Sequence, residues 1–273
     1  MTLPIILAAI CCCGEAPERA NDFFWENDKV GFRAYGPGDP HVWSGIDLFN
    51  KMPDAGATCG EVLHNHTKCG NWHVTPYKGI LDNYTIGAGR GLGAVALFGD
   101  GEWKTYPDWQ SCRIIAANDE RCEFELVYPA FSALGKMTYH ITLKKGDRFF
   151  RNEVTFENPK RIREFKLGPG LDVAASRGHA GDVWEDASLG VVSLFEDPKN
   201  DVEGSTMTAI FIDPASRDDV ELLTDAQGCR IIALRKPHFV YWAGCAWSNS
   251  GEITTAAQWH DEVRRFRNSL RCN

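Results

Sequence analysis

Five side chains that bind metals or transfer protons fall within fifteen residues of the sequence. They are Cys59, His64, His66, Cys69 and His73. Zinc binds cysteine and histidine in tetrahedral sets, and His64, His66 and Cys69 would supply three of the four ligands. The spacing fits no zinc finger, so two other interpretations stay open. One is a Cys59–Cys69 disulfide beside catalytic histidines, with His66 among them, and the other is a loop of solvated histidines.

Side chains suited to proton transfer continue beyond this cluster. His73, Tyr77 and Tyr84 could exchange protons with a substrate. A tyrosine acts as a base when a nearby cation lowers its pKa. Ordinary half-buried packing, with the polar tip in water, is the alternative for each of them.

Alternate glycines surround Arg90 between residues 87 and 93. A dinucleotide fingerprint needs a strand before such glycines and a helix after them. Here the apolar residues 91–98 predict a strand after them, so we reject nucleotide binding. The glycines instead let another backbone or a sugar approach closely. Arg90 could bind a carboxylate through two parallel hydrogen bonds, and a surface salt bridge is the alternative.

Further candidates for substrate binding are charged or aromatic. Asp47 and Lys51 follow the first predicted strand, 28–35, and structural salt bridging is the default interpretation for them. Tryptophan presents a large amphipathic ring, which suits contact with a sugar. Trp103 and Trp109 are candidates for that role, as is one of Trp242 and Trp247, the other of which would pack in the core.

Composition excludes several classes of protein. The chain has 273 residues, of which 44% are hydrophobic and 24% charged, so it is not a disordered chain. Lysine and arginine number 29 against 37 acidic residues, a net charge of −8 that argues against nucleic-acid binding. No apolar run approaches the ~18–20 residues of a membrane span. Nothing in the sequence indicates an oligomeric state.

Short alternating segments separated by turn residues dominate the pattern. Residues 136–143 and 149–156 predict a hairpin around the turn 145–148. Strands recurring at this spacing predict a large antiparallel β-sandwich. One helix is predicted near the end, where Trp259, Val263, Phe266 and Leu270 form a single apolar stripe. The segment 53–76 is polar and irregular, and such loops are usually functional or disordered.

The N-terminal residues 1–13 are apolar and resemble the core of a secretory signal, although no lysine or arginine precedes them. We interpret residues 1–20 as a signal or anchor segment and residues 21–273 as a single domain. Export to the periplasm or the medium of a bacterium is then expected, with a lipid anchor as one option. An extra buried strand is the alternative.

Seven cysteines follow residue 20, and two local pairs are spaced ten residues apart. In an exported protein Cys59–Cys69 and Cys112–Cys122 would be the predicted disulfides. The odd total leaves at least one thiol unpaired within the chain. Packing in the core is the simplest interpretation of Cys229 and Cys245.

Several of these segments together resemble the DUF4861 family of bacterial secreted proteins. The matching pieces are the residues Trp25–Gly36 (WENDKVGFRAYG), Ser44–Asp47 with Lys51, Trp72–His73, Gly79–Gly93 and Tyr241–Trp247 (YWAGCAW). The resemblance covers roughly residues 24–270, and its first motif is the most specific. The Cys- and His-rich loop 54–71 departs from the family pattern, so roles for its residues have no support from the family.

The resemblance implies a galactose-mutarotase-like supersandwich that acts on carbohydrate. Members occur with genes for the use of uronate-containing polymers, and one relative is described as an ulvan oligosaccharide dehydratase. Such an enzyme removes water from a terminal uronic acid and leaves a C4–C5 double bond. Arg90 or Lys51 would then neutralise the carboxylate, and His73, Tyr84 or His66 would transfer protons. The residues expected to bind substrate are Arg33, Asp47, Lys51, Tyr77, Asp82, Trp103 and Trp247.

Other functions stay open. An aldose epimerase needs an acid and a base around C1, and His73 with Asp82 could serve. A carbohydrate-binding protein would use the tryptophans without chemistry. A glycoside hydrolase would require two facing carboxylates. None of these requires a cofactor, and zinc at residues 59–73 is the one metal that the sequence suggests.

Overall fold

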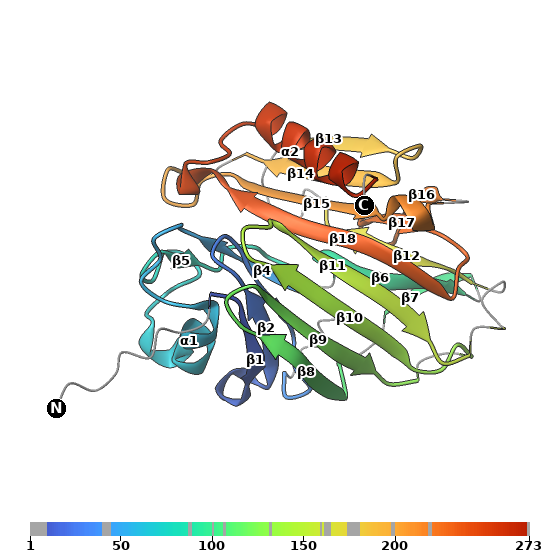
Figure 1. Ribbon diagram of the computed structural model, residues 1–273, viewed down its shortest axis with the longest axis horizontal. Coiled ribbons are helices and arrows are strands. Elements are labelled where there is room, and N and C mark those ends of the chain that lie inside the picture. Colours follow the sequence, from blue (N-terminus) through green and yellow to red (C-terminus); the bar gives the residue numbers. More distant parts are fainter. Residues whose placement is uncertain are drawn as a thin grey trace.

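Strands form most of the regular structure and assemble into three antiparallel sheets (Figure 1). The computed structural model describes residues 10–39, 45–86, 89–99, 101–105, 108–130, 133–158, 160, 165–173, 181–197, 200–217 and 220–271. The predicted fold class is confirmed, because the chain is a large antiparallel β-sandwich with a C-terminal helix.

The first sheet comes from the N-terminal third of the chain. Its five strands, in spatial order, are β1 (Cys12–Ala16), β2 (Asp22–Glu26), β3 (Gly31–Ala34), β4 (Ile46–Lys51) and β5 (Ile80–Leu81). Each strand is antiparallel to the next. This sheet carries most of the functional side chains described below.

The second sheet is the largest and combines the middle and the end of the chain. Its eight strands, in spatial order, are β13 (Gly181–Asp186), β14 (Val191–Glu196), β15 (Thr206–Ile212), β18 (His238–Trp247), β11 (Phe149–Phe156), β10 (Met137–Lys144), β9 (Arg121–Tyr128) and β8 (Ser111–Ala117). The predicted hairpin is present, since Met137 of β10 lies opposite Phe156 of β11.

The third sheet also has five strands. In spatial order they are β16 (Glu221–Thr224), β17 (Arg230–Ala233), β12 (Lys166–Leu171), β6 (Leu92–Gly99) and β7 (Glu102–Thr105). Residues after the glycine series therefore do form a strand, as predicted.

The core lies between the eight-stranded sheet and the other two. Alternate residues of β9 and β10 are buried, so one face of each strand points inward. Trp25 of β2 packs on Phe124 and Phe150 of the eight-stranded sheet, with ring centroids 5.3 and 5.5 Å apart. Leu97 and Leu167 bring the third sheet into the same core. Burial of this apolar surface holds the sheets together.

The predicted C-terminal helix is α2 (Ala256–Ser269). Thr255 and Gln258 form a capping box at its first turn. Its buried face packs on the outer side of the eight-stranded sheet, where Trp259 stacks on Phe149 and its indole N–H donates to the Thr208 carbonyl at 3.2 Å. The helix therefore covers one part of that outer face.

The segment 53–76 has more regular structure than its composition indicates. It contains α1 (Cys59–His64) and a 3-10 turn, η2 (His66–Lys68). Thr58 caps α1, and the Thr58 backbone N–H donates in return to the Glu61 carboxylate at 2.8 Å. Further 3-10 turns are η1 (Pro17–Arg19), η5 (Pro214–Ser216) and η6 (Ser248–Ser250).

The N-terminal residues belong to the fold from at least residue 10. We set residues 1–20 aside as a signal or anchor segment, but Cys12–Ala16 form β1 and pair with β2 along its whole length. Residues 12–16 therefore form a strand of the first sheet, as the alternative of an extra strand describes, whereas the boundary at residue 20 stays a prediction. Residues 1–9 lie outside the described residues, and export of the protein stays a prediction.

The two predicted disulfides are not formed. All nine cysteines in the described part of the chain are free thiols, and Cys272 lies outside that part. Cys112 lies opposite Leu126 in the β8–β9 ladder whereas Cys122 lies opposite Ala117, so the two are several ladder positions apart. The Cys69 thiol faces the carbonyls of Val62 and Asn65 rather than Cys59.

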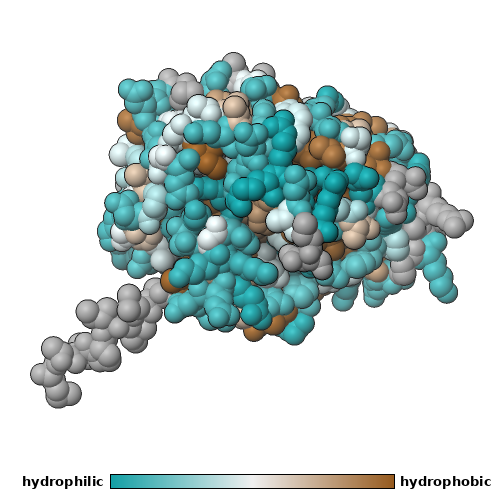
Figure 2. Space-filling view, turned by 45° about the horizontal axis from the view of Figure 1, so that its top comes forward, coloured by the Kyte–Doolittle hydropathy of each residue, from teal (hydrophilic) through white to brown (hydrophobic). Residues whose placement is uncertain are grey.

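The surface is polar, with hydrophobic side chains scattered over it. The face in Figure 2 is mostly hydrophilic and carries small separate hydrophobic patches. Within the described residues, no helix is long and apolar enough to cross a membrane.

Candidate functional site

A buried arginine organises the polar centre of the first sheet. Arg33 on β3 donates from Nε and Nη2 to the Asp47 carboxylate at 3.0 and 2.8 Å, and from Nη2 to Asp82 at 3.0 Å. Nη1 lies 3.3 Å from the Asp22 carboxylate. The Tyr35 hydroxyl donates to Asp47 at 2.8 Å. The register of the sheet explains the meeting, because Asp47 on β4 lies directly opposite Arg33.

Charge in this cluster is unbalanced. One guanidinium faces the carboxylates of Asp22, Asp47 and Asp82, and all of these side chains are at most 3% exposed. Burial raises the pKa of Asp47 to about 6, with a further contribution from the Asp82 charge. Burial also raises the pKa of Asp22 against the opposing effect of Arg33. The cluster therefore binds protons more tightly than isolated carboxylates do.

His73 connects this buried cluster with the surface. Its Nδ1 lies 2.9 Å from the Asp82 carbonyl oxygen and 3.2 Å from the Asp82 carboxylate. Both neighbours only accept hydrogen bonds, so Nδ1 carries the proton and the neutral ring keeps its lone pair on Nε2. Hydrogen bonding to Asp82, with its charge, raises the pKa of His73 despite partial burial. The side chain is 51% exposed, so it can reach a ligand.

Packing holds the imidazole in place. Its ring lies on the Trp72 indole, with centroids 4.3 Å apart and planes tilted by 31°. Trp72 in turn stacks on Phe49 of β4. The backbone N–H of Asp82 donates to the Trp72 carbonyl at 3.1 Å, which fixes the segment after β5 beside His73. A proton-transfer group is useful only when such support fixes its position.

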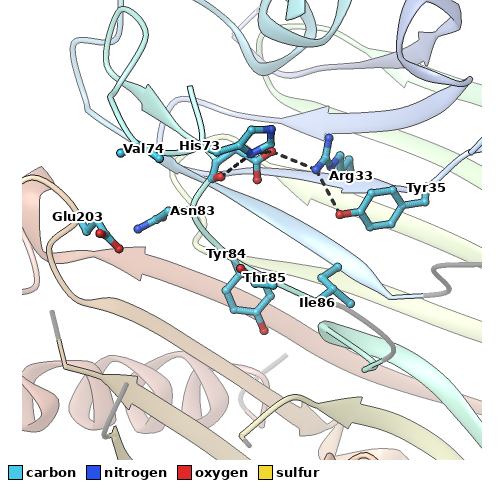
Figure 3. A pocket seen from close by; sticks show the side chains of 10 residues that line it. Arg33, Tyr35, His73, Val74, Asn83, Tyr84, Thr85, Ile86 and Glu203 are labelled. Carbon is cyan, nitrogen blue, oxygen red and sulfur yellow. Dashed lines mark hydrogen bonds and ion pairs between the residues drawn. The ribbon is translucent and has the colours of Figure 1, made fainter. Parts of the chain in front are cut away.

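His73 lines a cavity of about 380 Å³ (Figure 3). The size lies within the range of roughly 300–1,000 Å³ that is typical of small-molecule sites. The lining residues are Arg33, Tyr35, His73, Val74, Asp82, Asn83, Tyr84, Thr85, Ile86 and Glu203. In the figure Asn83 and Glu203 lie on one side of the cavity, and Arg33 with Tyr35 lies on the other.

Asn83 and Glu203, on the side of the cavity opposite Arg33, have polar groups available to a ligand. The Asn83 amide oxygen accepts from Asn50 at 2.7 Å, so its NH₂ group is the part available to a ligand. Glu203 belongs to the segment between β14 and β15, where Asn200 donates to its carboxylate at 2.8 Å. The Trp247 indole donates to the Glu203 carbonyl at 2.6 Å and holds this segment against β18.

Four of the predicted site residues therefore meet at the cavity: His73, Tyr84, Arg33 and Asp82. Tyr84 is buried, with 5% of its surface exposed. Asp47 was predicted to bind substrate but is only 1% exposed and lies behind Arg33, which places it in support of the cavity wall.

Two predicted cations lie elsewhere. Arg90 is buried at the start of the third sheet, where its Nε donates to the Asp225 carboxylate at 2.9 Å. Lys51 is bonded to Glu26 at 2.6 Å and to the Asn27 carbonyl at 2.7 Å. Neither residue lines the cavity, because a buried charge needs a partner inside the protein and each has found one.

The aromatic candidates are also used for packing. Trp247 is 3% exposed and Trp109, which packs on Phe23, is 5% exposed, so neither ring offers a surface to a sugar. Trp103 packs on Phe98 in the third sheet. Tyr77 is half-buried beside Lys78 and does not line the cavity.

The Cys and His cluster is not assembled as a metal site. His64 pairs with Glu18 at 2.7 Å, and Nδ1 of His66 lies 3.1 Å from the Leu63 carbonyl. Cys69 is buried, with its thiol on backbone carbonyls. No group of three or more metal-binding side chains occurs in the described ranges, so the residues predicted to bind zinc do not fit that ion in this arrangement.

The sequence interpretation missed Asp22, Tyr35, Asn83 and Glu203. Asp22 precedes the motif Trp25–Gly36 and Tyr35 lies within it, two residues after Arg33. The alternation of Arg33 and Tyr35 was a signal that could have placed these two side chains on one face. Glu203 left no such signal, because it reaches the cavity from a segment more than a hundred residues away.

Comparison with known sequences gives a family. The profile of the family described as "Domain of unknown function (DUF4861)" matches residues 10–272. Uncharacterized protein P7 of Formosa agariphila is 26% identical over 276 residues, which cover 95% of this chain and 68% of that protein.

Solved structures give weaker likenesses. A structure assigned as a kojibiose phosphorylase from the human microbiome aligns with 96% of this chain at a TM-score of 0.46 and 9% identity. The GH36 alpha-galactosidase AgaA of Geobacillus stearothermophilus, in complex with stachyose, aligns with 84% at a TM-score of 0.42 and 9% identity. This chain spans 37% and 41% of those two proteins. Likenesses of this size assign no activity.

Proposed function

The chain belongs to the DUF4861 family, and from that premise and the geometry of the cavity we propose that it is a carbohydrate-active enzyme. The proposed reaction is β-elimination on a uronic acid at the end of an oligosaccharide, which yields a C4–C5 unsaturated uronate and water. The cavity beside His73 is the proposed site.

One observation carries this proposal: a half-exposed histidine whose Nδ1 is fixed by Asp82 and whose Nε2 keeps a lone pair. Such a ring is a general base when neutral and a general acid when protonated. The pKa of His73 lies above its ordinary value, so the ring accepts a proton more readily than a solvated histidine does. The network behind it is buried, which keeps the base in one orientation.

The substrate carboxylate would be bound without a free arginine. Arg33 is the one described lining residue with a permanent positive charge, and its N–H groups are bonded to three carboxylates. We therefore assign recognition of the uronate to the Asn83 NH₂ group. Arg33 acts as a positioning residue, since it holds Asp82 and through it His73.

The elimination balances as follows. Nε2 of His73 takes the proton from C5, which is acidic because a carboxylate is attached to it. The electron pair of the C5–H bond forms the C4–C5 double bond, and the C4–O bond breaks. The Tyr84 side chain lines the same cavity, and its hydroxyl, which is buried in this arrangement, would turn toward the ligand and donate a proton to the leaving oxygen, so that water is released. Proton return from His73 to Tyr84 through solvent restores the enzyme.

The test is incubation of the protein with oligosaccharides that end in an unmodified uronic acid, followed by absorbance and mass together. New ultraviolet absorbance with the loss of one water per chain is the expected result. Absorbance with chain cleavage would indicate a polysaccharide lyase instead. Absence of any new absorbance across galacturonate, glucuronate and iduronate ends would overturn the proposal.

A second candidate is an aldose epimerase, and Glu203 favours it. Glu203 and His73 line the same cavity from different elements, so they could provide a base and an acid on two sides of a sugar ring. Asp82, which we first considered as that base, instead orients His73. Epimerisation would change optical rotation without new absorbance, and Glu203→Gln would abolish it.

A further inference from the structure

A second cavity, of about 360 Å³, lies on the outer face of the eight-stranded sheet. We call it the outer trough and define it by its lining residues Arg121, Glu123, Thr142, Lys144, Asp147, Arg151 and Trp242. It shares no residue with the cavity beside His73.

The register of four neighbouring strands builds the outer trough. Glu123 of β9 lies opposite Thr142 of β10, Thr142 lies opposite Arg151 of β11, and Arg151 lies opposite Trp242 of β18. Because opposite residues point to the same face of a sheet, these four side chains form one row across the strands. Arg121 and Lys144 form a second opposite pair two residues along.

Helix α2 forms one border of the outer trough. It packs over β14 and β15, and its Phe266 contacts the Trp242 ring at a centroid distance of 5.1 Å. Beyond Trp242 the strands β11, β10 and β9 run side by side without a described helix over them (Figure 1). The half-buried Trp242 therefore stands where the covered part of this face meets the open part.

The charges of the outer trough favour an anion that also carries hydroxyl groups. Arg121, Lys144 and Arg151 outnumber Glu123 and Asp147, although the whole chain has a net charge of −8. Arg121 is paired with Glu123 through Nε and Arg151 with Glu153 through Nη1, which leaves further N–H donors on each guanidinium. Lys144 makes no ion pair with any described residue.

We infer that the outer trough binds an acidic sugar unit of an oligosaccharide or polysaccharide, as a second carbohydrate site separate from the cavity beside His73. The three cations bind its carboxylate or sulfate group, and Asp147 and Thr142 hydrogen-bond its hydroxyls. Trp242, at the edge of the outer trough, contacts the apolar face of the sugar ring. The choice of a saccharide as the ligand rests on the proposed function, whereas the preference for an anion rests on the trough itself.

The test is affinity electrophoresis of the whole chain in gels that contain polygalacturonate, with a neutral galactan as the control polymer. His73→Gln is used as the background, so that turnover does not change the polymer. We expect retardation by polygalacturonate alone, with Lys144→Gln binding roughly tenfold more weakly. Lys68→Gln, on η2 far from the outer trough, removes the same charge and should bind as the parent does.

The possible results separate this inference from the proposed function. Loss of retardation in Lys144→Gln, with unchanged turnover of a short substrate by Lys144→Gln in the otherwise native protein, supports the outer trough. Absence of retardation, equal retardation by galactan, or an equal loss in Lys68→Gln overturns it. If no uronate is converted but Lys144→Gln still loses binding, the proposed elimination fails and the outer trough stands.

Discussion

Two buried arginines in this protein differ in the number of carboxylates that surround them. Arg33 and Arg90 have side chains that are each 3% exposed, and each donates from Nε to an aspartate. Among the described residues Arg90 forms an ion pair with Asp225 alone, and Asp225 also accepts from the backbone of Gln227 and Cys229 in its own turn. Arg33 is bonded to three aspartates, one of which continues to His73.

The difference supports the proposal that the region around Arg33 holds the active site. A one-to-one pair is neutral, and its aspartate also caps a turn, so its role is structural. Around Arg33, by contrast, burial and then the charge of Asp82 raise the pKa of Asp47, and hydrogen bonding to Asp82 raises the pKa of His73. Burial of an arginine is therefore uninformative by itself, and the number of carboxylates around it distinguishes the site from the scaffold.

Replacement of the histidine should have the largest effect. His73→Gln keeps a donor for Asp82 but removes the group that exchanges a proton, so kcat should fall by about 10²–10⁴. The melting temperature should change little, because the side chain is half exposed. Absorbance assays with circular dichroism melts measure both, and a variant with the full rate would remove His73 from the mechanism.

Removal of each arginine compares the two regions directly. Arg33→Met removes the guanidinium from three buried carboxylates and should lower the free energy of unfolding by about 3–5 kcal/mol or more. Arg90→Met removes the guanidinium from one and should cost less, about 3 kcal/mol. Urea unfolding gives both values. Folded Arg90→Met should have the kcat of the native protein. Loss of activity in that variant would show that Arg90 takes part in catalysis or substrate binding.

The raised pKa of Asp47 should appear as a dependence of stability on pH. Its folded-state pKa of about 6 exceeds the ordinary value, so the folded state binds more protons between about pH 4 and pH 6. The contribution of Asp47 to stability therefore increases as pH falls through this window, by about 1 kcal/mol between pH 6 and pH 5. Asp47→Asn should remove this dependence in urea titrations. An identical slope in both proteins would contradict the pKa.

The smallest effect concerns the pH profile of the reaction. Asp82 raises the pKa of His73, so Asp82→Asn should lower it. The base must be deprotonated, and the rate therefore increases with pH through this pKa. In the variant the acidic limb of the pH profile of kcat should move to lower pH. The pKa of the His73 ring, measured by NMR titration, should decrease with it. Asp225→Asn is the matched control, for which the limb should stay in place.

Local patterns in the sequence predict much of the fold and only part of the site. The alternation at 136–156 and the stripe from Trp259 to Phe266 each depend on residues close in sequence, and β10, β11 and α2 follow them. Strand β1 and helix α1 were missed, because the apolar run before Cys13 also resembles a signal and the Thr58–Glu61 capping box was overlooked among polar residues.

The contents of the site depend on long-range contacts. His73 and Asp82 lie in one motif and could be chosen from the sequence, but Arg33 meets Asp82 across 49 positions. In the sequence Arg90 and Lys51 looked equally available to bind a substrate carboxylate. Only the folded chain shows that they form ion pairs with Asp225 and Glu26. Partners of buried charges are determined by sheet register, which a single sequence does not reveal.

Strand β1 also determines where the chain can be shortened. It forms the outer strand of the first sheet, and the Cys11 backbone N–H beside it bonds to the Asn118 carbonyl at 3.1 Å. A chain that started at residue 21 would leave β2 as an edge with unpaired backbone groups and no covering strand. Such an edge pairs readily with a second molecule, so that protein should aggregate. A shortened chain that keeps the first sheet intact should therefore begin before Cys11.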